Sequence, residues 1–411
     1  MRHGQFIIGP QDVEECASSI LQDAIGLKDR GRKCQASVIW HILLYAAARI
    51  TSIFDACQRL ARAPKDDAVR AALRSGLPPI DELEERLNEG LRACLPQRWL
   101  HKTRRWRLAI DLTLLPYHGE PHHDPSEVYR GAAKSGTTHF HAYATCYVVC
   151  HGRRYNLAMA RVLLHTPMSE VLRRLLQRVR ALGIRPTLLL LDRGFYSVDV
   201  VRYLQAARVP FLMPMVLRGR KPSDPRGPSA THVFAARKRS GWDTYTWRNA
   251  EGVRATVSVG IAVTARRRRG KKPIQQGSQG GQRRRIKHAV RKRVTLVYAY
   301  WGFQPASPTW MRETYRLRFG IESSYRQMNQ GRIRTCTRDP LLRLLFVAIA
   351  LILRNLWVWF HMKLLSTPRR GRRALRLEAL RLRTMLLWLI HLVEELLGTN
   401  DQADAYVPTD T

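Results

Sequence analysis

The segment "TYRLRFGIESSYRQMNQGRIR", residues 314–334, has the pattern of a helix and carries a single carboxylate, Glu322, among cations, amides and aromatic side chains. Side chains that are three, four or seven positions apart share one face of a helix. Tyr315, Arg318 and Glu322 have this spacing, and Asn329 returns to the same face. The sequence therefore predicts one helix that presents these four side chains in a single stripe, and this face is a candidate functional site.

The charge of the chain indicates what such a site acts on. The 411 residues include 70 Lys and Arg against 32 Asp and Glu, which leaves a formal charge of +38. An excess of this size repels itself unless a polyanion is the working partner, so we expect the partner to be nucleic acid. The hydrophobic content of 45% is that of a globular protein with two or three packed domains.

The cysteines and the N-terminus indicate the compartment. Seven cysteines are scattered without a C-x-x-C pair, so their pattern indicates neither a disulfide framework nor a zinc ribbon. The first residues, "MRHGQFIIGPQDVEE", contain no apolar run of signal-peptide length. We therefore expect a protein of the reducing cytoplasm, associated with the nucleoid through DNA.

One apolar stretch, residues 341–365, raises the question of a membrane span. Its longest uncharged part, residues 344–353, is shorter than the ~20 residues that cross a bilayer, and Arg354 and Asn355 separate it from the remaining apolar residues. The stretch predicts a buried core helix and no membrane partner.

Apolar periodicity divides the chain into regions. Helical spacing recurs in residues 16–27, 36–61 and 81–95, which predicts a separate all-helical domain. Three β-rich runs (106–119, 140–152 and 154–165) predict a three-strand meander. A helix (169–183), a strand (186–192), a helix (198–209) and a strand (210–216) come next and imply a parallel portion of sheet.

The predicted organisation has five parts. They are a helical DNA-binding domain (1–104), the first part of a catalytic domain (105–216), a β-rich insertion with a basic disordered loop (217–294), the second part of the catalytic domain (295–362), and basic C-terminal helices with a tail (363–411). A further strand is predicted at 294–302, where the second part of the catalytic domain begins.

Three carboxylates carry the chemistry that we predict. Asp111 lies inside an apolar strand, Asp192 comes directly after four leucines at a strand end, and Glu322 lies on the helix at 314–334. Acids from separate elements that meet at a sheet edge suit two Mg²⁺ ions roughly 4 Å apart, which activate a water and stabilise a leaving oxygen in phosphoryl transfer. The set predicts a nuclease or a strand-transfer enzyme.

Each residue alone also has a structural interpretation. Asp111 fits an acid paired with an arginine, Asp192 fits the cap of a turn, and Glu322 fits an ion pair with Arg318 or Arg326 on the same helix. Tyr315 and Arg318 alone fit a core aromatic and a surface cation. The motif "HHDPSE", residues 122–127, has the side chains of a metal site, but adjacent histidines on a turn are usually solvated, so it is interpreted as a solvated turn. Only the three acids together favour catalysis.

On these residues the chain resembles a DDE transposase of the insertion-sequence class, whose signature is Y-x-x-R-x-x-x-E-x-x-x-x-x-x-K. Tyr315, Arg318 and Glu322 match this signature, while Asn329 stands where the family has Lys. The segments "DLTLLPYHG", "KSGTTHFHAYAT" and "LLLLDRGFYS" resemble the family's strand of the first aspartate, its second strand and its strand of the second aspartate. The resemblance covers residues 105–360.

The resemblance implies a fold, a site and partners. The fold is α/β, with an RNase H-like mixed five-stranded sheet flanked by helices and a β-rich insertion. The catalytic and metal-binding acids are Asp111, Asp192 and Glu322, with Mg²⁺ as cofactor, replaceable by Mn²⁺. The partners are the terminal inverted repeats of a transposon and target DNA, held by a homodimer. The expected DNA contacts are Tyr315, Arg318, Asn329, Arg326, Arg332 and Arg193.

The residues leave other functions open. A non-transposing nuclease or resolvase on the same fold requires the same acids but no binding of specific ends. A DNA-binding protein descended from a transposase is suggested only by Asn329, where an arginine such as Arg326 or Arg332 would otherwise have to supply the missing cation. Arginine runs at 266–269, 283–285 and 369–373 are expected to bind DNA phosphates without reading bases.

Overall fold

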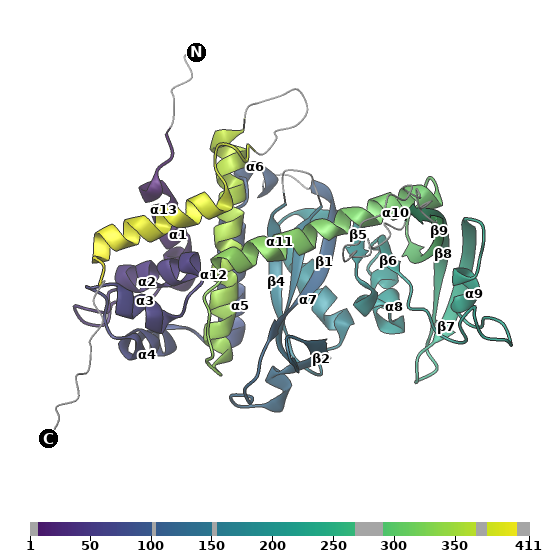
Figure 1. Ribbon diagram of the computed structural model, residues 1–411, viewed down its shortest axis with the longest axis horizontal. Coiled ribbons are helices and arrows are strands. Elements are labelled where there is room, and N and C mark those ends of the chain that lie inside the picture. The colour runs from purple at the N-terminus through teal and green to yellow at the C-terminus, as the bar shows by residue number, and fades with distance from the viewer. Residues whose placement is uncertain (1–6, 101–103, 150–153, 268–290, 367–375, 401–411) are drawn as a thin grey trace, which may run out of the picture. The chain divides into compact units, whose positions relative to one another are not determined.

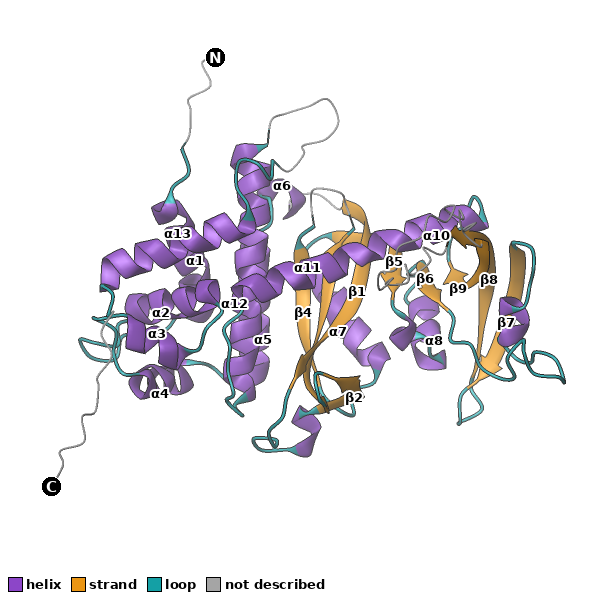
Figure 2. Cartoon of the chain, viewed as in Figure 1, coloured by secondary structure: helices purple, strands orange, loops and turns teal. Residues whose placement is uncertain are grey.

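The computed structural model describes residues 7–100, 104–149, 154–267, 291–366 and 376–400. The chain forms two compact units, residues 1–187 with 318–411, and residues 188–317. Helices and strands of both units are labelled in Figure 1 and coloured by type in Figure 2. Each unit is described by itself.

Unit 1 begins with six helices. They are α1 (Pro10–Ile25), α2 (Ala36–Arg49), α3 (Ile53–Arg59), α4 (Asp66–Gly76), α5 (Ile80–Ala93) and α6 (Gln97–Leu100). The stretch 36–61, where apolar residues have helical spacing, forms two helices, because Ile50 adopts a left-handed conformation with φ 59° that ends α2. The Ser52 hydroxyl then accepts a hydrogen bond from the Asp55 amide and starts α3. Helix α4 lies outside the three stretches in which the sequence predicts helices.

The apolar stretch near the C-terminus forms the core helix of unit 1. Helix α12 (Pro340–Phe360) continues into a π turn (His361–Leu365) and is buried over almost its whole length. By length and composition it is the one helix of the described residues that could cross a membrane, or one of two if the bent pair α2 and α3 counts as a span. Its most apolar window is 94% buried inside the protein, so the predicted core helix is confirmed.

The N-terminal helices pack around this core helix. Helix α5 contacts α12, and α13 (Leu382–Leu397) contacts α1 and α2. Helix α5 is also tied to the sheet by Glu84, which is 1% exposed and accepts hydrogen bonds from the Arg161 amide at 2.6 Å and the Arg178 guanidinium at 2.7 Å. The compact unit therefore does not end near residue 104, where the sequence predicts the boundary of a separate helical domain.

The sheet of unit 1 is antiparallel and has β3 at its centre. Its strands are β1 (Arg104–Pro116), β2 (Tyr129–Lys134), β3 (Thr137–Val148) and β4 (Asn156–Val162), and β3 pairs with each of the other three. Strands β1, β3 and β4 form the predicted meander, with β2 as an additional short strand. Helix α7 (Met168–Ala181) packs on β4 and β3.

Unit 2 contains the parallel portion that the sequence predicts. Strand β5 (Ile184–Leu191) carries the chain into unit 2, α8 (Val198–Ala206) comes next, and β6 (Phe211–Pro214) pairs parallel with β5. Strands β9 (Arg291–Trp301), β8 (Arg254–Arg267) and β7 (Gly241–Arg248) extend the sheet in antiparallel order. Two helices, α9 (His232–Ala235) and α10 (Pro308–Arg316), complete the unit. The protein is thus an α/β protein with a mixed sheet and a helical N-terminal region.

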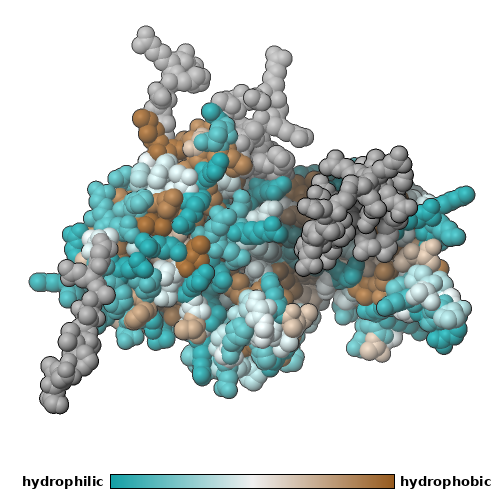
Figure 3. Space-filling model, in the orientation of Figure 1, coloured by the Kyte–Doolittle hydropathy of each residue, from teal (hydrophilic) through white to brown (hydrophobic). Residues whose placement is uncertain are grey.

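The predicted insertion at 217–294 holds α9, β7 and β8. Part of the arginine run at 266–269 and all of the runs at 283–285 and 369–373 lie outside the described residues. On the face drawn in Figure 3, hydrophilic side chains cover most of the described surface, with apolar ones scattered among them.

Candidate active site

Asp111 lies in the middle of β1, opposite Thr145 of β3. Its side chain is 15% exposed, and its Oδ2 atom accepts a hydrogen bond at 2.9 Å from the Nη1 atom of Arg318. Its Oδ1 atom accepts from the Leu112 amide at 2.9 Å. A carboxylate this deeply buried needs such donors, because taking it out of water unpaired costs several kcal/mol.

Arg318 joins two of the predicted acids. Its side chain is 6% exposed and lies in a 3-10 turn (Leu317–Phe319) just before α11 (Gly320–Met328). Its Nη1 atom binds Asp111, and its Nη2 atom lies 3.9 Å from Oε1 of Glu322. Two carboxylates that are 211 positions apart in the sequence thus converge on one guanidinium.

Glycine at position 320 allows α11 to begin at this place. A Cβ atom at Gly320 would lie 2.4 Å from the Tyr147 hydroxyl and 2.9 Å from Cζ of Arg154. Real Cβ atoms do not approach other atoms so closely, so any larger residue would push the start of α11 away from β3. Because Glu322 is two residues further along the helix, Gly320 sets the position of this acid.

Tyr325 was not predicted as a site residue, and it fixes the strand beneath Asp111. Its hydroxyl donates to the Asp111 carbonyl at 2.9 Å and lies 2.7 Å from Oγ1 of Thr145. Burial, and after it the charge of Asp111, raises the pKa of Tyr325, so the hydroxyl remains a donor at neutral pH. Its place one helical turn after Glu322 is the only sequence signal that could have found it.

Buried Arg354 holds the other side of α11. It is 2% exposed, donates from Nη1 to the Arg154 carbonyl at 2.5 Å and from Nε to Gln327 of α11 at 3.3 Å. Burial lowers the pKa of Arg354 to about 10, which leaves it charged at neutral pH. The acid-bearing helix is therefore tied to both the sheet and the core helix α12.

Three predicted site residues belong to unit 2. Asp192 follows β5 and precedes a 3-10 turn (Arg193–Phe195) without a cap hydrogen bond from its side chain, and Arg193 is exposed. Tyr315 is 6% exposed, and its ring centroid lies 5.4 Å from that of Tyr298 on β9. Tyr315 therefore has the environment of a core aromatic residue.

The single helix predicted for residues 314–334 is wrong. Helix α10 ends at Arg316, α11 ends at Met328, and a further 3-10 turn (Asn329–Gly331) precedes extended chain at Arg332. Glu322 and Arg326 lie on the exposed face of α11, and Asn329 is exposed in the turn directly after it, while Arg318 points inward. Of the predicted stripe, Glu322 and Asn329 are exposed, whereas Tyr315 and Arg318 are buried.

The acids supply oxygen ligands of the kind that divalent cations prefer. Among the residues that the structure describes, no group of three or more His, Cys, Asp or Glu side chains could hold a metal ion, and this includes the histidines of "HHDPSE". Within unit 1, Asp111 and Glu322 share a guanidinium, so a positive charge already occupies the position between them. Their donor chemistry therefore fits a cation.

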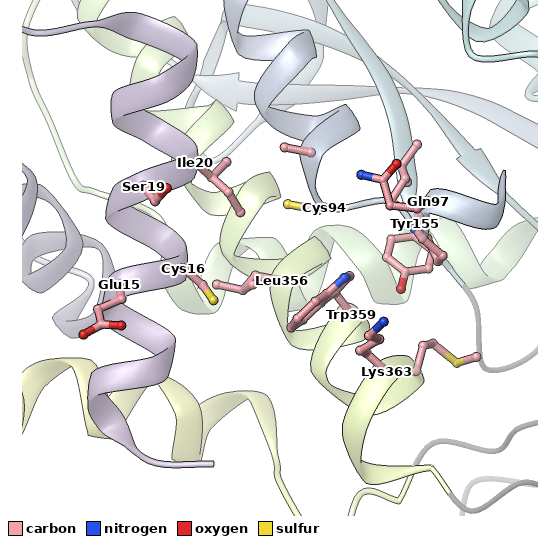
Figure 4. Close-up of a pocket in the computed structure, with 14 residues that line it drawn as sticks. Glu15, Cys16, Ser19, Ile20, Cys94, Gln97, Tyr155, Leu356, Trp359 and Lys363 are labelled. Carbon is pink, nitrogen blue, oxygen red and sulfur yellow. The ribbon is translucent and has the colours of Figure 1, made fainter. Parts of the chain in front are cut away.

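A cavity of about 750 Å³ in unit 1 is lined by α1, the end of α5, Tyr155 and α12 (Figure 4). None of the predicted site residues lines it. Burial raises the pKa of the Cys16 thiol, and that of Cys94 even more, so neither is a nucleophile at neutral pH.

Comparisons with known proteins place this geometry in a family. Residues 102–356 match the family model of the transposase DDE domain. The cryo-EM structure of the piggyBac transposase synaptic complex with hairpin DNA is similar with a TM-score of 0.53 and 12% identity, over 97% of this chain and 82% of that chain, and this likeness shows the fold alone. None of the curated proteins matches this chain. Because the matched region covers more than half of the 411 residues, the chain belongs to the DDE transposases, which are DNA-cleaving enzymes.

Proposed function

We propose that this transposase moves an insertion sequence by cutting and pasting, with strand cleavage at the terminal inverted repeats and strand transfer to target DNA. The observation that carries the proposal is the convergence of Asp111 and Glu322 on Arg318, within the region that matches the transposase DDE domain. An arrangement that gathers acids around one buried cation is costly to build and is typical of a catalytic site.

The acids of the site would hold the metal ions. By the family pattern, Asp111, Asp192 and Glu322 are the ligands, on a catalytic domain of the RNase H-like type with a five-stranded sheet. Two Mg²⁺ ions would activate the attacking oxygen and stabilise the leaving one. Within the chain, Arg318 offsets one of the two negative charges of Asp111 and Glu322, which lowers the repulsion between the acids, and Tyr325 keeps the Asp111 backbone in register with α11.

DNA is the proposed partner of the exposed residues near the acids. Arg326 lies on the exposed face of α11 with Glu322, Asn329 is exposed directly after that helix, and Arg193 is exposed next to Asp192. A guanidinium binds phosphate oxygens in a fork, and an amide binds them without charge. Helices of residues 1–104 would recognise the ends of the transposon. A homodimer would hold both ends together, and the reaction would take place in the cytoplasm, at the nucleoid.

The test of the acids uses a plasmid that carries the DNA flanking this gene. Asp111→Asn, Asp192→Asn and Glu322→Gln should each abolish Mg²⁺-dependent nicking while binding of the same DNA is retained, because the acids contribute ligands for metal and no attraction to phosphate. Asp81→Asn is the matched control, since Asp81 is an 86% exposed acid on α5. Retained nicking in any of the three variants refutes the assignment of that acid, and parallel loss of binding in all three indicates a structural role.

A further inference from the structure

The segment that comes after α11, residues 332–338 or "RIRTCTR", is held in place at several points and is called here the arginine segment. Ile333 is fully buried, and the Arg334 amide donates to the Thr51 carbonyl at 2.9 Å. The Thr337 carbonyl accepts a hydrogen bond at 2.6 Å from Nε of Arg343, which is 5% exposed. The backbone of the arginine segment is therefore preorganised, so a ligand has to order only the exposed side chains.

Its exposed side chains alternate with covered ones. Arg332 has an extended backbone with φ −109° and ψ 126°. Positions 334, 336 and 338 are exposed, whereas 333, 335 and 337 are buried or half-buried. Four residues of fully extended chain advance about 13 Å, which is the upper limit for the separation of the Arg334 and Arg338 backbones. Arg334 and Arg338 thus present two cations on one side of the segment, with Arg332 at its start.

The positive charge of this region lacks acidic partners. Within the described part of the chain, neither the three arginines of the segment nor Arg343 forms an ion pair. Asp339, the acid next to Arg338 in the sequence, binds the Arg74 guanidinium at 3.4 Å and caps α12 through the Leu341 amide. Burial, and after it the charge of Arg343, lowers the pKa of Arg332, which shows that like charges crowd together here.

We propose that the arginine segment binds phosphates along one strand of DNA. A preorganised row of unpaired cations matches a polymer that presents one phosphate per 3.4 Å of axis on each strand. Base reading is not expected, because the contacts are cation to phosphate. The inference rests on the proposed function, and it places a phosphate grip immediately after the helix that carries Glu322.

The test compares the salt dependence of binding to a duplex of random sequence. The double variant Arg334→Gln with Arg338→Gln removes two exposed cations, so the log–log slope of affinity against salt should become less steep by about 1.8. Between about 50 and 200 mM salt, the double variant should therefore lose about twelve-fold less affinity than the unaltered protein. Thermal unfolding checks that both proteins are folded.

The matched control is Arg173→Gln with Arg226→Gln, which removes two exposed arginines that are each paired with an acid two or three residues away and that lie outside the helices assigned to end recognition. This control should leave the slope almost unchanged. An equal change in both double variants would mean that only net charge matters, and an unchanged slope in the first would exclude the grip. Stabilisation by inorganic phosphate alone that disappears in the Arg334 and Arg338 variant would reveal a small-anion site and overturn the proposal. Metal-dependent nicking is measured separately in the unaltered protein. If the protein nicks DNA although the slope test fails, only the phosphate-binding proposal is refuted and the proposed function stands.

Discussion

The hydroxyl of Tyr325 connects the acid-bearing helix to the sheet through a chain of two hydrogen bonds. A carbonyl can only accept, so the single Tyr325 proton is donated to the Asp111 carbonyl, and Thr145 must donate to the Tyr325 oxygen. Tyr325→Phe removes both bonds while preserving the ring. Thr145→Val removes one bond together with its donor.

The expected costs depend on the groups that each change leaves without a partner. Tyr325→Phe deprives a buried hydroxyl donor and a carbonyl of their bonds, which should lower the free energy of unfolding by about 2–3 kcal/mol. Thr145→Val should cost about 1 kcal/mol, because no donor is left behind. In the double variant the Thr145 donor is already absent, so the combined cost should fall short of the sum by about 1 kcal/mol.

Urea unfolding of the unaltered protein, the two single variants and the double variant measures this coupling. Tyr129→Phe is the control, since the Tyr129 hydroxyl forms no hydrogen bond with the described residues. Strictly additive costs, or a loss in Tyr325→Phe no larger than in the control, would refute the hydrogen-bond chain. Tyr325→Phe should also slow nicking more than it weakens DNA binding, because it shifts the strand that carries Asp111.

Two further predictions concern buried positions. His141 is 4% exposed, and burial lowers its pKa to about 3, so the unfolded chain binds its proton first as the pH falls below the ordinary value of 6.5. The free energy of unfolding should therefore decrease by about 2 kcal/mol through this residue as the pH falls from 6 to 4.5. In urea unfolding measured across this pH range, His141→Phe should remove this decrease, and a variant with the same pH profile as the unaltered protein would contradict the prediction. Gly320→Ala should cost about 1–3 kcal/mol through overpacking against Tyr147, whereas Gly194→Ala, whose Cβ would meet nothing within 4 Å, should be nearly neutral when both are followed by thermal unfolding.

Local patterns in the sequence were sufficient for much of the fold. Alternating and helical periodicity predicted β1, β3 and β4 as a meander, the parallel pair of β5 and β6, and α12 as a buried core helix. These features arise from side chains that repeat at the period of a strand or a helix, and such repeats are read from neighbouring residues alone. The spacing of Arg318 and Glu322 within one helical turn belongs to the same class of information.

Contacts between distant residues depended on the tertiary structure. The sequence shows that Asp111 needs a cation, but only packing of α11 on β1 and β3 selects Arg318, 207 positions away, and recruits Tyr325. The same packing turns Arg318 inward, although periodicity alone places it on an exposed stripe with Asn329. Whether a polar side chain faces a sheet or solvent depends on which surface its helix covers, and that choice is made by side-chain packing across the whole unit rather than by local spacing.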